Sequence, residues 1–202
     1  MRKLFLAAIL VLGLAGFCFA QENSLLIDSF EVMITGGATG TVDFGAGNGS
    51  SVTVTGDTSI VKDGSQSLKV VYDAVPGGYI WVARGAGLDA KAAQWLRNPK
   101  DIDWGKYKAI AFYMYGNDSK ASIAFDLKDN GSEIWRYTTT DNFKGWKQII
   151  CPFADFYARS DWQPDASDKN SQMDFPIKSY QFEPLPESKG TLYFDEVRLI
   201  AK

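Results

Sequence analysis

Short segments in which apolar and polar residues alternate recur along the chain, bounded by Gly, Asn, Asp and Pro. In YKAIAFYMY, Ile110, Phe112 and Met114 share one face, and ASIAFDL repeats the pattern from Ile123 to Leu127. A period of two predicts antiparallel strands with one buried face. About ten such strands, with no repeat or linker between them, predict an all-β fold, a single antiparallel β-sandwich of the jelly-roll kind. The segments are 24–32, 50–56, 67–73, 79–84, 107–116, 121–129, 133–140, 146–153, 177–184 and 191–200.

The last of these segments contains an irregularity. Leu192 and Phe194 share one face, but the apolar parity then shifts to Val197 and Leu199. An extra residue in the strand explains the shift, and such a bulge would turn the carboxylate of Asp195 or its neighbour out of the ladder.

The first twenty residues, MRKLFLAAILVLGLAGFCFA, have a different character, with two basic residues, an apolar run, and then Cys18 and Ala20 as small residues before an expected cut. This pattern is typical of a secretory signal peptide, and the apolar run is short for a membrane span. A lipid anchor at Cys18 is the weaker interpretation, because the bulky Phe17 precedes it. We expect residues 1–20 to be cleaved and residues 21–202 to form one domain that is secreted or periplasmic and not inserted in a membrane.

Charge and the missing residue types exclude several function classes. Cleavage removes Arg2 and Lys3, which leaves 19 of the 21 basic residues against 24 acidic ones and a formal charge of −5. Without a basic cluster, this balance argues against nucleic acid as a partner. The sequence contains no histidine, which excludes Ser-His-Asp and Cys-His catalysis, and Cys151 in the apolar run IICPF is expected to be a buried hydrophobe. Glycoside hydrolysis needs two carboxylates, but no motif singles out such a pair, so we expect no enzyme.

One short stretch, YARSDWQP, places Arg159, Asp161 and Trp162 within four residues. A sugar ring has an apolar face that packs on an aromatic ring and hydroxyls that donate and accept hydrogen bonds, so an Arg, an Asp and a Trp together suit its recognition. The alternative is that Arg159 and Asp161 pair with each other on the surface while Trp162 caps the core.

Five segments, LIDSFE, DGSQSLKVVY, GWKQIICPFADF, RSDWQP and GTLYFDEVRLI, follow in order the pattern of the family 11 carbohydrate-binding modules, which are galactose-binding-like β-sandwiches. The resemblance spans about Leu25 to Ala201. It implies a module that binds β-1,3-1,4- and β-1,4-linked glucans, without catalysis, in a cleft across the concave sheet. Residues implied to line that cleft are Arg159, Asp161, Trp162 in place of a stacking tyrosine, Tyr79, and Asp129 or Asn130.

The sequence departs from this family pattern at three places. Ala38 and Pro184 stand where the family has aromatic residues, and residues 86–101 form an insertion that contributes Trp95. The insertion includes LDAKAAQWLRN, the one stretch with a helical tendency, for which we expect a helical turn.

The resemblance also implies a structural calcium ion, since related sandwiches hold one where the first strand, the DGSQS turn and the last strand meet. Carboxylates and carbonyls are the ligands that this hard cation prefers. The alternative is that these are ordinary turn and edge carboxylates. The candidate ligands are Asp28, Glu31, Ser65 and Asp195, with Asp63 nearby in the sequence.

A second and weaker resemblance concerns YKAIAFYMYGNDSKASIAFDLKDNGSEIWRY and FKGWKQI, which are similar to sheath proteins of spirochaete periplasmic flagella. It implies a structural, protein-binding component of an extracytoplasmic assembly. We therefore expect a secreted, non-catalytic β-glucan-binding protein, with the sheath-type structural protein as the alternative.

Overall fold

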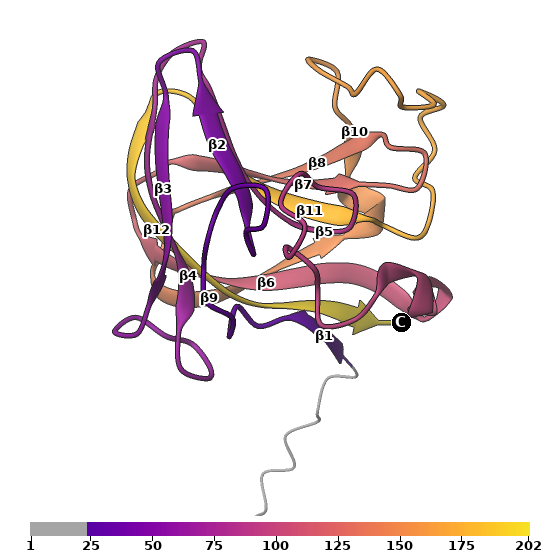
Figure 1. Ribbon diagram of the computed structural model, residues 1–202, viewed down its shortest axis with the longest axis horizontal. Coiled ribbons are helices and arrows are strands. Elements are labelled where there is room, and N and C mark those ends of the chain that lie inside the picture. Colours follow the sequence, from indigo (N-terminus) through magenta and orange to yellow (C-terminus); the bar gives the residue numbers. More distant parts are fainter. Residues whose placement is uncertain (1–23) are drawn as a thin grey trace, which may run out of the picture.

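The computed structural model describes residues 24–202 (Figure 1). This part of the chain contains twelve β-strands and three short 3-10 helices, joined by loops. The predicted signal peptide lies outside this part. Within residues 24–202, no helix has the length and apolar character needed to cross a bilayer. The elements are β1 (Ser24–Asp28), β2 (Asp43–Gly47), β3 (Ser51–Asp57), β4 (Ser67–Ala74), β5 (Tyr79–Gly85), η1 (Pro99–Asp101), η2 (Trp104–Lys106), β6 (Tyr107–Asn117), β7 (Ser122–Lys128), β8 (Ile134–Thr140), β9 (Lys144–Pro152), η3 (Phe153–Asp155), β10 (Tyr157–Ala158), β11 (Ser179–Pro184) and β12 (Ser188–Ala201).

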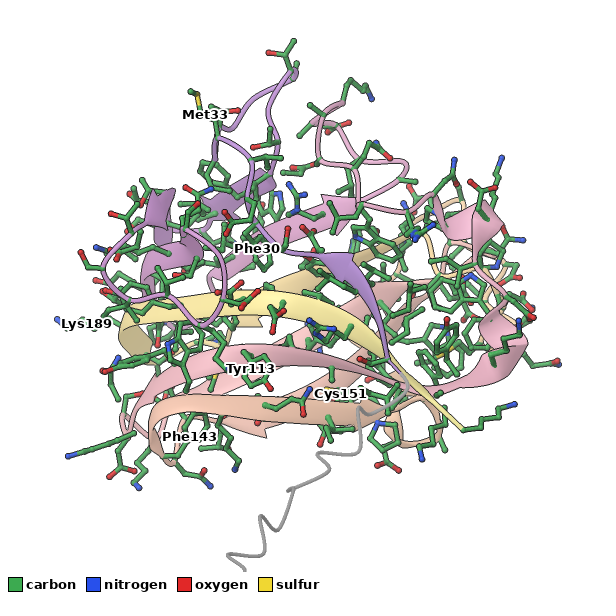
Figure 2. The ribbon with its side chains drawn as sticks, turned by 90° about the horizontal axis from the view of Figure 1, so that it is seen from below. Phe30, Met33, Tyr113, Phe143, Cys151 and Lys189 are labelled. Atoms are coloured by element: carbon green, nitrogen blue, oxygen red, sulfur yellow. The ribbon has the colours of Figure 1, made fainter. Side chains whose placement is uncertain are left out.

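The strands form two six-stranded sheets, which confirms the predicted antiparallel β-sandwich. Sheet A has the order β3-β4-β12-β6-β9, and β1 also pairs with β12. Sheet B has the order β10-β8-β7-β11-β5-β2. Figure 2 shows sheet A from outside, with β12, β6 and β9 side by side and Tyr113 on β6.

The core lies between the sheets and is built from the apolar faces of the alternating strands. Phe182 of sheet B stacks on Phe194 of sheet A with ring centroids 3.9 Å apart, and Phe112 and Phe125 meet at 4.7 Å. All four rings are completely buried. Cys151 is also fully buried, as expected, and burial raises the pKa of its thiol. Because each strand directs every second residue inward, the intervening residues of sheet B are left to form an outer face.

The predicted bulge in the last strand is confirmed. The register between β12 and β6 shifts between Asp195 and Arg198, and Glu196 adopts a positive φ of 44°. At this point the edge partner of β12 changes from β4 to β1. Val197 and Leu199 then return to the core.

Two predictions about local structure were incomplete or wrong. Strands β2 and β10 were not predicted, because DFGAG contains two glycines and β10 has two residues. The helical turn expected in residues 88–98 is absent from that stretch, which has turns, bends and irregular residues, and a 3-10 turn, η1, follows it within the insertion. Backbone hydrogen bonds hold the stretch against the sandwich, and Trp95 stacks on Tyr180 with centroids 5.7 Å apart. Core packing by Trp95 thus replaces helix formation.

Candidate functional site

A pocket of about 740 Å³ lies on the outer face of sheet B. Its walls come from β5, β8 and β11 and from the loops that precede β5, follow β10 and follow β11. A second pocket of about 120 Å³ adjoins it, since Trp162 and Gln181 line both, and Leu88 of the insertion lines the second one. The larger pocket is lined by Gly77, Gly78, Tyr79, Ile80, Trp81, Arg136, Arg159, Asp161, Trp162, Gln181, Glu183, Leu185 and Pro186.

Two aromatic side chains of β5 form one wall of this pocket. Tyr79 and Trp81 lie nearly parallel, with centroids 6.0 Å apart and an interplanar angle of 22°, and Tyr79 is 47% exposed. Their strand partners on β2 are Gly47 and Gly45, where a Cβ atom would overlap the rings. The glycines of β2 therefore leave the space into which these rings lean. The indole Nε1 of Trp81 donates to Asp43 at 3.0 Å, which fixes that ring.

Trp162 supplies a third aromatic surface and is 56% exposed. The guanidinium carbon of Arg159 lies 5.8 Å from its ring centroid, within the range of a cation–π contact. The next residue, Gln163, accepts from the backbone N–H of Ile134 at 2.7 Å and donates to the carbonyls of Ile134 and Arg159 at 2.9 Å. The loop is thus pinned to β8, and Trp162 is presented to the pocket.

Arg159 ties this loop to two strands of sheet B. Its Nε and Nη2 donate to the two carboxylate oxygens of Asp161 at 2.8 and 3.0 Å. Its Nη1 donates to Asp126 at 3.2 Å and to Glu183 at 2.9 Å. The hydrogen bonds from Arg159 hold the pKa of Asp161 below its ordinary value, so Asp161 is ionised at neutral pH.

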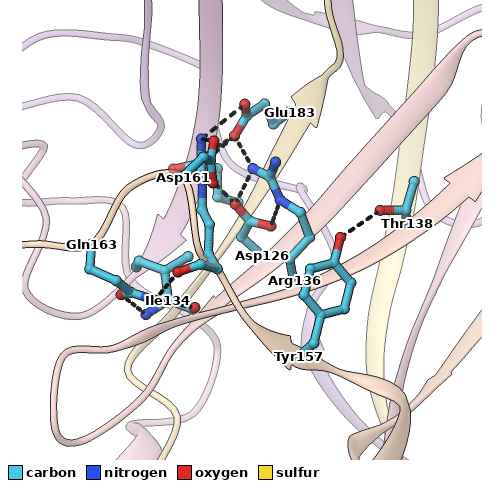
Figure 3. A network of polar contacts seen from close by, with 10 residues as sticks. Asp126, Ile134, Arg136, Thr138, Tyr157, Asp161, Gln163 and Glu183 are labelled. Atoms are coloured by element: carbon cyan, nitrogen blue, oxygen red, sulfur yellow. Dashed lines mark hydrogen bonds and ion pairs between the residues drawn. The ribbon is translucent and has the colours of Figure 1, made fainter. Parts of the chain in front are cut away.

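A second guanidinium, that of Arg136, completes the network. Its Nε and Nη2 each donate to Asp126 at 2.8 Å, and Nη2 also reaches Glu183 at 2.6 Å (Figure 3). Burial raises the pKa of Glu183, against the opposing effect of both arginines. Two cations and three anions therefore form one cluster at the floor of the pocket, in which Asp126 is buried and lines the second pocket, and Asp161 is the exposed edge.

These features combine aromatic surface with fixed donors and acceptors in one concave site. A family model described as carbohydrate binding domain (family 11) matches residues 20–202. The chain belongs to this family of carbohydrate-binding modules.

Relatives of this family 11 module include both enzymes and isolated modules. Endoglucanase H of Acetivibrio thermocellus is 32% identical over 108 residues, which are 50% of this chain and 12% of that protein. The chain therefore matches about one eighth of the length of that curated relative.

Solved structures share the fold of the module. The family 11 module of the cellulosomal cellulase Lic26A-Cel5E of Clostridium thermocellum has a TM-score of 0.67 and 22% identity, covering 89% of this chain and 95% of its own. A Clostridium thermocellum family 11 module in complex with a β-1,3-1,4-mixed-linked tetrasaccharide gives the same TM-score and identity over 88% and 95%. A β-1,2-glucanase from Parabacteroides distasonis has a TM-score of 0.52 and 14% identity, over 87% of this chain and 24% of that one.

The pocket of the module brings together four of the five residues expected from the sequence, and Asp129 is the exception. Asp129 is completely buried and accepts hydrogen bonds from the backbone of Glu133 and Asp174 and from the indole of Trp135. It fastens a loop beneath the sheet, which corrects its expected place in the cleft. The neighbouring Asn130 does not line the pocket either.

Sequence reasoning missed Trp81, Arg136, Gln181 and Glu183, all of which line the pocket. Each alternates with a core residue on its strand, as Arg136 does with Trp135. The outward positions of the predicted strands were therefore a usable signal, because period two assigns them to the face opposite the core.

The expected calcium ligands divide into two groups. Glu31 accepts from the hydroxyl and the backbone N–H of Ser65, and Asp195 accepts from the backbone N–H groups of Lys62 and Asp63 at 3.1 and 3.2 Å. Three of the four candidates thus converge on the turn at residues 62–65. Burial raises the pKa of Asp195 to about 6, and a cation beside this carboxylate would favour its ionised form.

Asp28 has a different role from the one the resemblance implies. It is buried, pairs with both Nε and Nη2 of Arg84, and accepts from the hydroxyl of Tyr180 at 2.7 Å. Asp28 is therefore held by Arg84 and Tyr180 inside the sandwich, whereas Glu31 and Asp195 accept from the 62–65 turn, and this removes Asp28 from the candidate ligand set. Within residues 24–202, no group of three or more His, Cys, Asp or Glu side chains is arranged to hold a metal ion. An ion at the 62–65 turn would depend on Glu31, Asp195 and oxygens of the turn.

Proposed function

We propose that the pocket on sheet B binds a β-glucan chain, with the mixed β-1,3-1,4 linkage as the first ligand to test. The observation that supports this most directly is that Tyr79, Trp81 and Trp162 line the same pocket as the charged floor. A glucan presents an apolar face and a rim of hydroxyls on every ring, so it can contact both kinds of surface at once. The tetrasaccharide complex of the structurally similar module supports the choice of ligand.

The adjoining pocket supports a ligand longer than one sugar. Trp162 and Gln181 belong to both pockets, so a chain that leaves the larger one would pass these two residues into the smaller one. The insertion contributes Leu88 to that second wall. A polymer, rather than a free monosaccharide, is therefore the ligand that would use the full concave surface.

We further propose that binding is not coupled to hydrolysis. A glycosidase needs one carboxyl group free to donate a proton and a second that attacks or activates water. In the cluster beside this pocket, Asp126, Asp161 and Glu183 each accept from a guanidinium. Each carboxylate is therefore held in an ion pair and is not free to donate a proton or to attack a glycosidic bond, even though burial raises the pKa of Glu183. Incubation with mixed-linkage glucan should release no reducing sugar.

Native affinity electrophoresis tests the binding proposal. Residues 21–202 are run in gels that contain mixed-linkage β-glucan, xyloglucan or no polymer, beside Trp162→Ala. We expect retardation by the glucan, lost in Trp162→Ala, with melting temperatures that agree closely because the indole is 56% exposed. A large fall in the melting temperature would identify Trp162 as a core residue instead. Absence of retardation by any polysaccharide would overturn the proposal in favour of the structural alternative, which the comparisons above do not otherwise support.

Secretion and the calcium ion are separate parts of the proposal. The signal-peptide pattern supports export, and N-terminal sequencing of the exported protein should begin at Gln21. The convergence of Glu31, Ser65 and Asp195 on one turn supports a stabilising ion. Neither secretion nor an ion at this turn depends on which ligand the pocket binds.

A further inference from the structure

The five N–H groups of the Arg159 guanidinium all have partners within the pocket. A guanidinium carries one hydrogen on Nε and two on each Nη. Nε is taken by Asp161, Nη1 by Asp126 and Glu183, and Nη2 by Asp161 and, at 3.5 Å, by Glu183. A sugar hydroxyl that accepted from Arg159 would have to displace one of these charge-assisted contacts. Arg159 is therefore poorly placed to be the donor toward a ligand.

Arg136 is in the opposite situation. Its Nε and Nη2 are used by Asp126 and Glu183, whereas no hydrogen bond among the described residues involves its Nη1. The residue is 8% exposed and lines the pocket. In residues 24–202, Trp95 Nε1 is the side-chain atom that is both sealed from solvent and without a partner. Nη1 of Arg136 is therefore not sealed from solvent, belongs to a side chain that lines the pocket, and has two hydrogens to donate.

An underused acceptor lies on the adjoining side chain. Oε2 of Glu183 accepts from Arg136, Arg159 and Gln181, while Oε1 has one contact, with Arg159 at its 3.5 Å limit. Arg136 and Glu183 touch each other at 2.6 Å. A donor without a partner and an acceptor with one long contact therefore lie on two side chains that touch each other beside the pocket.

We propose that Arg136 and Glu183 are the specificity-determining polar contacts of this module, and that they recognise a pair of neighbouring hydroxyls on a neutral sugar ring. One hydroxyl accepts from Nη1 of Arg136 and its neighbour donates to Oε1 of Glu183. Arg159 is a positioning residue that holds Asp161 and Trp162 in place. This inference rests on the proposed function, because it assigns the polar contacts of that same ligand.

The charge of the floor adds a prediction about the ligand class. Three carboxylates, of Asp126, Asp161 and Glu183, face two guanidiniums, of Arg136 and Arg159. The cluster therefore carries a net negative charge, which disfavours a sugar with its own carboxylate. Neutral glucans should bind and uronate-rich polymers should not.

The test is NMR of the guanidinium N–H groups of residues 21–202 titrated with the β-1,3-1,4 tetrasaccharide. Spectra of Arg136→Lys and Arg159→Lys assign the signals. We expect the Nη–H signals of Arg136 to shift and saturate together with the indole N–H of Trp162, while the Nε–H of Arg159 moves little. The titration itself is carried out on the unchanged protein, and the two variants serve only to assign its signals.

Affinities measured by calorimetry complete the experiment. We expect Glu183→Gln, which keeps the shape of the side chain, to weaken tetrasaccharide binding about 10-fold, because it removes a charged acceptor. Without ligand, the indole N–H signal of Trp162 in Arg159→Lys should differ from that of the parent protein, because Arg159 positions Trp162.

The outcomes separate this inference from the proposed function. If Trp162 shifts but Arg136 does not, or if Arg159 shifts in its place, the assignment to Arg136 and Glu183 is overturned and glucan binding stands. If no signal shifts at millimolar tetrasaccharide, both the proposed glucan binding and the assignment to Arg136 and Glu183 are overturned.

Discussion

Both outer faces of the sandwich carry aromatic side chains, but the two sheets use them differently. On sheet B, Tyr79 and Trp81 lie nearly parallel at the wall of a pocket, and nearly half of Tyr79 is exposed. On sheet A, Tyr115 meets Trp146 at 78° and Tyr193 at 82°. Edge-to-face contacts cover the rings with one another. The same residue types thus line the candidate binding pocket on one sheet and form a packed layer on the other.

The difference originates in the strand register. Tyr115 directly opposes both Trp146 and Tyr193, so three large rings lie on neighbouring strands and must pack together. Lys69 adds a cation 5.6 Å from the ring centroid of Tyr193. The aromatic pair of sheet B opposes two glycines of β2, so its strand partners supply no side chain to pack against it. Glycine at the edge of sheet B therefore leaves room for the aromatic wall of the candidate site.

Replacing one of these glycines should have the largest effect. In Gly45→Ala, the new Cβ would overlap the indole of Trp81, which must leave its hydrogen bond with Asp43 and displace Tyr79. We expect glucan binding to weaken by about 100-fold, or about 2.7 kcal/mol, and the unfolding free energy to fall by about 1–3 kcal/mol. Calorimetric titration with the tetrasaccharide and urea unfolding measure the two effects.

A matched control for this change exists on sheet A. In Gly190→Ala the nearest atom to the new Cβ is the hydroxyl of Tyr72 at 3.7 Å, an ordinary contact. Binding and stability should both remain close to the parent values. Unchanged binding by Gly45→Ala would show that Trp81 lies outside the ligand path.

A pair of tryptophan substitutions should separate the two faces. Trp162→Ala removes an exposed ring, and we expect binding to weaken by about 30-fold, the equivalent of about 2 kcal/mol of buried apolar surface, with stability within about 0.5 kcal/mol. Trp146→Ala removes a ring packed on Tyr115, so stability should fall by about 1–3 kcal/mol and binding should stay within about twofold. Thermal melts measure the stability and the calorimetric titration measures the binding of both variants. Loss of binding in Trp146→Ala would contradict the assignment of binding to sheet B alone.

The alternation of apolar residues predicted most strands and the sandwich, because it depends on local burial. Strand β2 was missed for a reason linked to function. Glycine has low strand propensity, and DFGAG resembles a loop until the rings that occupy the space above it are known. A strand that looks weak in the sequence is therefore part of the candidate site.

The candidate site, too, was predicted only where its residues are close together in the sequence. Arg159, Asp161 and Trp162 were found because they lie together in one loop. Arg136 and Glu183 are single polar residues on separate strands, and they become neighbours through the sheet register, with Asp126 opposite Arg136. The sequence left open whether Arg159 binds sugar or pairs with Asp161, and the structure shows the pairing. Long-range register, which no local pattern contains, brings Arg136 and Glu183 together, whereas the pairing of Arg159 with Asp161 lies within one loop.

The bulge on sheet A offers a test in which the two faces should respond independently. Asp195→Ala removes a carboxylate that accepts three backbone N–H groups, so we expect a stability loss of about 1–3 kcal/mol. If an ion binds the 62–65 turn, a chelator should lower the melting temperature of the parent and leave that of Asp195→Ala unchanged. Glucan binding should be the same in all four samples. A parent melting curve insensitive to chelator would argue against the ion.

The smallest effect should come from Tyr79→Phe, which retains the ring and removes its hydroxyl. If Tyr79 acts through its aromatic face, the ring of phenylalanine packs on the sugar equally well, and binding should change by less than about threefold. Tyr79→Ala is the matched comparison, with an expected loss of about 10-fold. A loss in Tyr79→Phe as large as in Tyr79→Ala would mean that the hydroxyl binds the sugar directly. The contrast between the sheets would then concern hydrogen bonding at Tyr79 as well as ring packing.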